Sequence, residues 1–192
     1  MKPTHWLLFI PLAWSTCGLA DTAPSQSPAA GSWRQAPTSD AAGTMTFTRY
    51  TLLGKFSASP RGQPDRPALA VDCLSAAESH ASKGRFLAAN LLVGIPVRIV
   101  YVEPEEIHGM SYLPKVAVVL RANAGNNDEE QWPVGADKSS AAVPKDALKT
   151  ILHARTVEIT AADDHGAPIK MTFDIPQSDF VENGCNVDEH KG

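Results

Sequence analysis

The chain has 192 residues, of which 43% are hydrophobic, enough to bury the core of one domain. It carries 17 Lys and Arg against 21 Asp and Glu, a formal net charge of −4, and the basic residues form no cluster. Nucleic acids and anionic membrane surfaces bind proteins through concentrated positive charge, so this balance excludes both as expected partners. The hydrophobic content also excludes wholesale disorder. The sequence predicts a single globular domain, and its composition indicates no particular activity.

Residues 1–20 read MKPTHWLLFIPLAWSTCGLA and have the features of a secretory signal peptide. Lys2 precedes an apolar run that is about half of the ~20 residues needed to span a bilayer, so a permanent membrane helix is not expected. Gly18 and Ala20 are the small residues that a peptidase requires at positions −3 and −1. We therefore expect cleavage after Ala20, no membrane span afterwards, a mature charge of −5, and a periplasmic or secreted protein.

Cys17 offers a second interpretation of the same segment, as the lipidated cysteine of a lipoprotein. A lipobox has Leu at position −3 and Gly or Ala at −1, whereas this chain has Trp14 and Thr16 there. The sequence therefore favours the cleaved signal peptide over lipidation.

Cleavage after Ala20 leaves two cysteines, Cys73 and Cys185. An even pair in an oxidising compartment predicts one disulfide. The spacing is unlike the CxxC of reactive thiol pairs, and the surroundings lack the basic residues that activate a thiolate. We expect a structural bridge that ties the C-terminal end of the domain to an early strand.

The N-terminal part of the mature chain begins with a flexible leader at 21–32, DTAPSQSPAAGS, which lacks apolar periodicity. Residues 44–53 are rich in Thr, aromatic and aliphatic side chains and predict a strand. Three prolines and a glycine in 57–67 predict an exposed loop. Residues 68–74 alternate so that Cys73 shares the core face with Leu69 and Val71.

Three further strands are expected in the middle of the chain, at 86–93, 97–102 and 115–121. Residues 123–130, NAGNNDEE, predict a polar turn that includes the acidic run, and the chain returns through Trp132 as a hairpin. Pro144–His153 is the one expected helix, because its apolar residues recur at helical spacing.

The last two strands, 156–161 and 169–175, alternate apolar and polar residues around a polar turn and predict a hairpin. Many short strands with one helix favour antiparallel pairing, since parallel strands would need a helix between most of them. The fold class we predict is a mainly β protein, an antiparallel β-sandwich with one short helix. Its single domain spans 33–186, followed by a C-terminal tail at 187–192.

The order of several residues resembles an exported family. Trp33 opens the domain, Met45 and Phe47 lie in the first expected strand, and a strand of the form L-x-V-x-C precedes the basic strand residue Arg98. Trp132, the helix, the run F-D-I at 173–175 and Cys185 follow. Over residues 33–185 this pattern is similar to the small exported bacterial β-sandwich proteins represented by the type VI secretion-associated VasI proteins. The resemblance implies an accessory or binding role in the cell envelope, with no cofactor and no catalytic residue.

The residues that could carry chemistry are few. Asp163, Asp164 and His165 suit acid–base work, but a hairpin tip rich in Asp and Gly is also what a turn requires. We keep a hydrolase in which they act with His108 as one alternative, and a small-ligand carrier with an apolar cavity between the sheets as another. The chain has no phosphate-binding glycine motif and no G-x-S-x-G, and we expect neither a cofactor nor a metal.

Aromatic and apolar residues give the remaining candidates for binding. A loop at 110–113 is apolar, and with Trp132 it is a candidate contact patch for a protein partner. The alternative for Trp132 is a place in the core of the sandwich. The favoured function is thus a non-catalytic binding or accessory module whose contact residues are Met110, Tyr112, Leu113 and Trp132.

Overall fold

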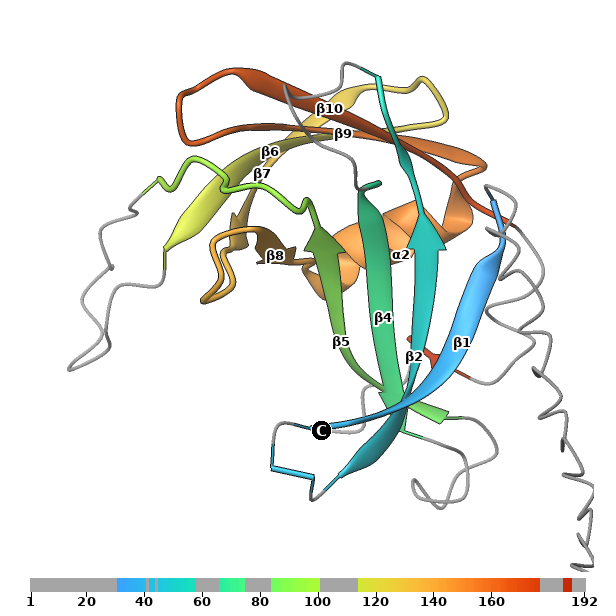
Figure 1. The fold of residues 1–192 in the computed structure, drawn as a ribbon. Helices are drawn as coiled ribbons and strands as arrows, with labels where there is room; N and C mark the ends of the chain where they lie inside the picture. The colour runs from blue at the N-terminus through green and yellow to red at the C-terminus, as the bar shows by residue number, and fades with distance from the viewer. Residues whose placement is uncertain are drawn as a thin grey trace, which may run out of the picture.

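The structure is a computed structural model, and it describes residues 31–40, 42–43, 45–57, 66–74, 84–100, 114–176 and 185–187. The predicted signal peptide, most of the leader and of the 57–67 loop, and the tail beyond Val187 lie outside these residues. So do His108, Met110, Tyr112 and Leu113. The described residues form two β-sheets and one helix, as the predicted β-sandwich requires (Figure 1).

The first sheet, sheet A, has the strand order β1-β2-β4-β5, with two short strands added along β5. Its pairs are antiparallel except that of β11 with β5, which is parallel. Strand β4 is buried along its whole length, because it is a central strand of the sheet and two of its outward residues, Ala68 and Ala70, are small. The strands are β1 (Trp33–Ser39), β2 (Thr46–Leu53), β4 (Ala68–Leu74), β5 (Gly84–Leu92), β8 (Ser140–Ala142) and β11 (Cys185–Asn186).

The second sheet, sheet B, has the order β3-β10-β9-β6-β7, and all its pairs are antiparallel. In Figure 1 its strands cross the top of the molecule above those of sheet A. The strands are β3 (Lys55–Phe56), β6 (Lys115–Ala122), β7 (Asn127–Pro133), β9 (Thr156–Ala162) and β10 (Pro168–Asp174).

The two sheets are joined along both of their sides. On one side β2 continues into β3 through Gly54, where a Cβ atom would lie 2.7 Å from the ring of Phe173. Only glycine fits this close approach, and it lets one chain segment serve both sheets. On the other side an isolated bridge between Val134 and Ala141 links the end of β7 to β8.

The core lies between the sheets and is filled by the alternate residues of each strand, as the period of a half-buried strand requires. Helix α2 (Lys145–His153) passes behind sheet A in Figure 1 and buries Ala147, Leu148 and Ile151 in this core. At its end the His153 Nδ1 atom lies 2.7 Å from the carbonyl oxygen of Lys149. The observed helix and its one buried face confirm the helix predicted at Pro144–His153.

The predicted disulfide is present between Cys73 on β4 and Cys185 on β11, with 5.8 Å between the Cα atoms. Both cysteines are buried, and Val187 beside them is buried as well. The bond holds the short strand β11 against β5, where only two residue pairs match. It therefore fastens the C-terminal end of the domain to the centre of sheet A.

Two predicted elements differ from the structure. The strand expected at 97–102 is no continuous strand in its described part, because Val97 bridges Asp163 while Val100 bridges Lys115. Its two ends have different partners, so the segment crosses between strands of sheet B. The acidic run expected in a turn, Asp128 to Glu130, instead lies within β7. Strands β1, β3, β8 and β11 were not expected from the sequence.

Candidate functional site

The hairpin tip between β9 and β10 contains three residues proposed for acid–base chemistry. The Asp163 carboxylate accepts hydrogen bonds from the backbone N–H groups of His165 at 3.0 Å and Ala167 at 2.7 Å. This is an Asx-turn, which fixes the loop and occupies that carboxylate oxygen. The His165 side chain is 87% exposed, and its Nε2 atom lies 3.6 Å from Asp164. The turn interpretation explains these contacts, and His108 lies outside the described residues.

Trp132 is not available for surface contact. Its side chain is 0% exposed, and its indole N–H donates a 2.6 Å hydrogen bond to the Glu130 carboxylate. The expectation that Trp132 belongs to a contact patch is therefore corrected, because the side chain lies on the core face of β7. The other three members of the expected patch lie outside the described residues.

The outer face of sheet B has a hollow of about 660 Å³ that sequence analysis did not anticipate. The side chains of its floor are short: Ala117 and Val119 on β6, Thr160 and Ala162 on β9. They alternate with Val118 and Ala161, which point into the core. Short side chains in the middle of a sheet, between longer ones on the neighbouring strands, leave this space open to solvent.

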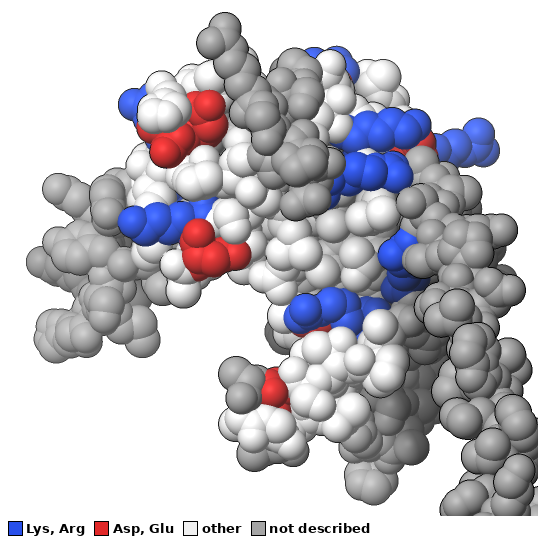
Figure 2. Space-filling model, viewed as in Figure 1, with Lys and Arg blue, Asp and Glu red and all other residues white. Residues whose placement is uncertain are grey.

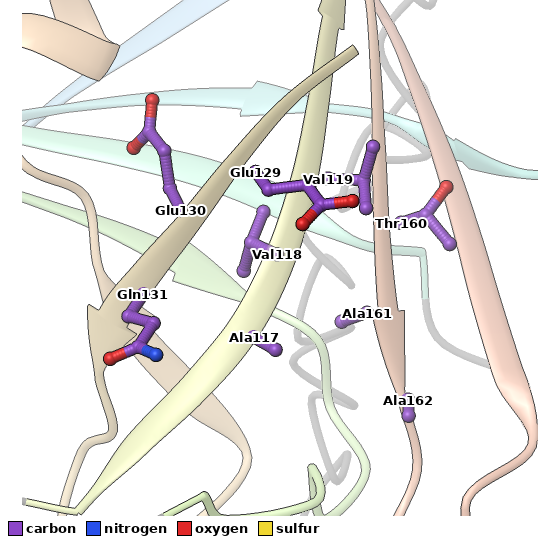
Figure 3. A pocket seen from close by; sticks show the side chains of 9 residues that line it. All are labelled: Ala117, Val118, Val119, Glu129, Glu130, Gln131, Thr160, Ala161 and Ala162. Carbon is purple, nitrogen blue, oxygen red and sulfur yellow. The ribbon is translucent and has the colours of Figure 1, made fainter. Parts of the chain in front are cut away.

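The wall of the hollow on the side of β7 is polar. Figure 3 shows the Glu129 carboxylate extending from β7 across β6 toward Val119, while Glu130 points to the opposite side of the strand. Gln131 stands beside Glu129 on the same outer face, paired with Ala117. Within the described part of the chain, Glu129 makes no ion pair and no side-chain hydrogen bond. The hollow is therefore bounded on one side by a solvent-exposed carboxylate that has no side-chain partner among the described residues.

A second hollow of about 300 Å³ shares Val119 and Thr160 with the first and extends it toward β10. One oxygen of Glu158 lies 3.0 Å from Arg121 Nη2 and 3.0 Å from Lys170 Nζ. Two cations thus share one carboxylate, which leaves one positive charge in excess at this end. The two hollows form one groove on the outer face of sheet B, with Glu129 on its β7 wall and the cluster of Arg121, Glu158 and Lys170 across β6, β9 and β10.

The opposite side of the sandwich carries a different arrangement. Asp72 on β4 is 6% exposed and receives hydrogen bonds of 2.7 and 2.8 Å from Arg49 on β2. Asp72 raises the pKa of the Arg49 guanidinium, mainly through this hydrogen bond. The guanidinium also lies over the Phe47 ring, 5.7 Å from its centre. The pair is complete within the chain, so we interpret it as structural.

Figure 2 looks onto this face of sheet A, the one away from α2 and the core. Basic and acidic side chains are spread around it, and its middle is largely uncharged. Among the described residues that Figure 2 shows on this face, the charged side chains are therefore not gathered in one place.

The signals for the groove are present in the sequence but are weak. Alternation in 115–121 and 156–161 identifies Ala117, Val119 and Thr160 as outward residues. Glu129 pairs with Val119 across the hairpin, but it could not be recognised as part of the groove because the sequence predicts a turn there. The pairing of Arg121, Glu158 and Lys170 depends on the register of three strands, which alternation alone does not give.

Among the described residues, no three His, Cys, Asp or Glu side chains are grouped so that they could hold a metal ion. In the same part of the chain, no helix has the length and apolar character needed to cross a membrane. Comparisons with family models, with curated proteins and with solved structures gave no match.

Proposed function

We propose that the chain is an exported cell-envelope protein, periplasmic or secreted, that acts as a non-catalytic binding module for a protein partner. The observation that carries this proposal is the groove on sheet B, which is open, floored by small side chains and flanked by charged residues. Rigid strands hold every residue of the groove, so the surface exists before a partner arrives. The resemblance to the VasI proteins implies the same kind of role, and we include it in this proposal.

Export is supported by the signal-like segment at residues 1–20 and by the buried Cys73–Cys185 bond. A disulfide persists in oxidising compartments and is rare in a reducing cytosol. The test is fractionation of cells producing the full chain, followed by N-terminal sequencing. A periplasmic or extracellular protein that begins at Asp21 supports the proposal. An uncleaved cytosolic chain contradicts it, and a lipid on Cys17 would correct the processing.

Partner binding is tested by placing a photoreactive amino acid at Gln131, an exposed wall residue of the groove. The matched control carries the same amino acid at Thr150, an exposed position on α2. After irradiation of whole cells, one envelope protein should be linked reproducibly from Gln131 and not from Thr150. Equal products from both positions, or none from Gln131, would refute the groove as the binding surface.

A further inference from the structure

Strand β7 is the outermost strand of sheet B, so alternate residues along it direct their backbone groups away from the sheet. The N–H group of Val134 donates a 2.8 Å hydrogen bond to the carbonyl oxygen of Pro114, in the register that pairs β7 with β6. In an antiparallel pair, every second residue directs both of its backbone groups to the same neighbour. The residues that face β6 in this way are Asp128, Glu130 and Trp132. Those whose N–H and C=O groups point out of the sheet are Asn127, Glu129 and Gln131.

These outward backbone groups have no hydrogen-bond partner among the described residues. The side chains of Asn127, Asp128 and Glu129 are exposed although they alternate between the two faces of the strand, so this part of the edge is open on both faces. Farther along, the chain turns to β8 through a bridge at Val134. The edge of β7 is therefore open to solvent over residues 127–131.

The other outermost strands of the two sheets lack such an edge within the described part of the chain. On β1, a 3.0 Å hydrogen bond from the Asp40 N–H group to the Met45 carbonyl oxygen places Pro37 among the residues whose backbone faces outward. Proline has no N–H group, so it interrupts the row of donors on that edge. Strands β3 and β11 have two residues each. Strand β7 is therefore the described edge on which another strand can pair without interruption.

The acidic run of β7 determines which kind of strand can pair there. Opposite charges on directly opposed residues stabilise a pair of strands, and like charges destabilise it. Two copies of β7 would place acidic residues opposite one another, so a second copy of this chain is a poor partner for the edge. Asp128 and Glu129 make no ion pair with any described residue. A strand with basic residues opposite them would supply both carboxylates with a partner.

We infer that an extended segment of the protein partner adds to β7 as an antiparallel strand, with two consecutive basic residues opposite Asp128 and Glu129. This inference rests on the proposed function, and it adds how the partner attaches and what its segment contains. Hydrogen bonds to the outward backbone groups provide the affinity, and the basic residues select the segment and its register.

The test measures fluorescence anisotropy with the exported, disulfide-bonded protein and a labelled nine-residue peptide whose central sequence is Thr-Val-Lys-Lys-Thr. In the antiparallel register, the first Lys lies opposite Glu129 and the second lies opposite Asp128. N-methylation of the first Thr and the first Lys removes N–H groups that face β7, so the affinity should fall at least tenfold. N-methylation of Val and the second Lys removes N–H groups on the far side of the added strand and should change the affinity less than twofold. Equal weakening by the two methylated peptides, or no binding of the unmethylated peptide, would overturn the inference.

A charge exchange tests the selection of basic residues. The Glu129→Lys variant should bind the natural Lys-Lys peptide about fivefold more weakly, because an ion pair is replaced by a repulsion between exposed groups. It should prefer a peptide whose first Lys is replaced by Glu, which is an outcome that misfolding cannot produce. Asp174→Lys is the matched control, because it makes the same change of charge on β10, on the far side of β9 and β6 from β7. The control should keep the preference of the natural protein, and an unchanged preference in Glu129→Lys would contradict the pairing.

The outcome can be separated from that of the proposed function. If cross-linking from Gln131 captures an envelope protein but the two methylated peptides bind alike, the groove is a docking surface and the added strand is wrong. If cross-linking from Gln131 fails, the proposed function fails with it.

Discussion

Removal of the disulfide is the perturbation whose magnitude follows most directly from the structure. The bond closes a loop of 112 residues between Cys73 and Cys185, which is most of the domain. The double variant Cys73→Ala with Cys185→Ala removes it without leaving a free thiol. Treatment of the natural protein with a reductant breaks the same bond and retains both sulfur atoms, so the two experiments separate the crosslink from the loss of packing.

The chain-entropy model gives about 4.8 kcal/mol at 25 °C for a loop of this length. Residual structure in the unfolded chain reduces this value, and we expect reduction to lower the free energy of unfolding by about 3 kcal/mol. The alanine variant should lose about 1 kcal/mol more, since both cysteines are buried and their sulfur atoms leave small cavities.

Urea unfolding followed by tryptophan fluorescence measures both effects. With an m-value of about 2 kcal/mol/M, a loss of 3 kcal/mol moves the midpoint down by about 1.5 M. The m-value itself should rise, because an unfolded chain without the crosslink exposes more surface. A reduced protein whose midpoint and m-value equal those of the oxidised protein would refute the argument, because the bond would then not restrict the unfolded chain.

Three further predictions concern single side chains. Replacement of Arg49 by Met should destabilise the fold by about 3 kcal/mol in urea unfolding, because it leaves the Asp72 charge buried and unpaired. The variant Asp72→Ala should cost less, because the side chain of Arg49 is 38% exposed and keeps its contacts with water. Equal losses in the two variants would contradict this asymmetry. Replacement of Glu130 by Ala should cost about 1–3 kcal/mol of stability in the same assay, because the buried indole N–H of Trp132 loses its acceptor. The control variant Glu129→Ala should leave the stability unchanged. Burial raises the pKa of Tyr50 above its usual 10.0, so the native state loses stability as the pH rises from 10 through that higher pKa. The variant Tyr50→Phe should flatten this loss of stability. An alkaline unfolding profile that is the same in the variant and the natural protein would refute the prediction.

The elements that sequence analysis predicted well have a clear internal period. Strand β4 was expected at 68–74 and is found at Ala68–Leu74, and no end of β9 or β10 differs from expectation by more than one residue. In both cases alternate apolar residues face one core and turn residues mark the ends. The disulfide was predictable for another reason, because the expected cleavage after Ala20 would leave only two cysteines.

The strands that were missed lack such a signal. Strand β1 contains Pro37 and exposed polar residues without alternation, and it becomes a strand because β2 offers it seven matched residues. Strands β3, β8 and β11 have only two or three residues, which is too few for a period to be seen. Strands β3, β8 and β11 are defined by pairing partners that are distant in the sequence, and a local pattern does not contain that information.

The acidic run of β7 explains why the candidate site was harder to predict than the fold. Three consecutive acids resemble a solvated turn, and β7 is the outermost strand of sheet B, where charges protect an edge from pairing with another chain. Strand geometry then divides the run between two faces. Glu130 turns inward to accept the indole N–H of Trp132, and Glu129 turns outward over the groove. Because a shift of register by one residue would turn Glu130 and Trp132 outward and Glu129 inward, the burial of Trp132 also fixes which carboxylate faces the groove.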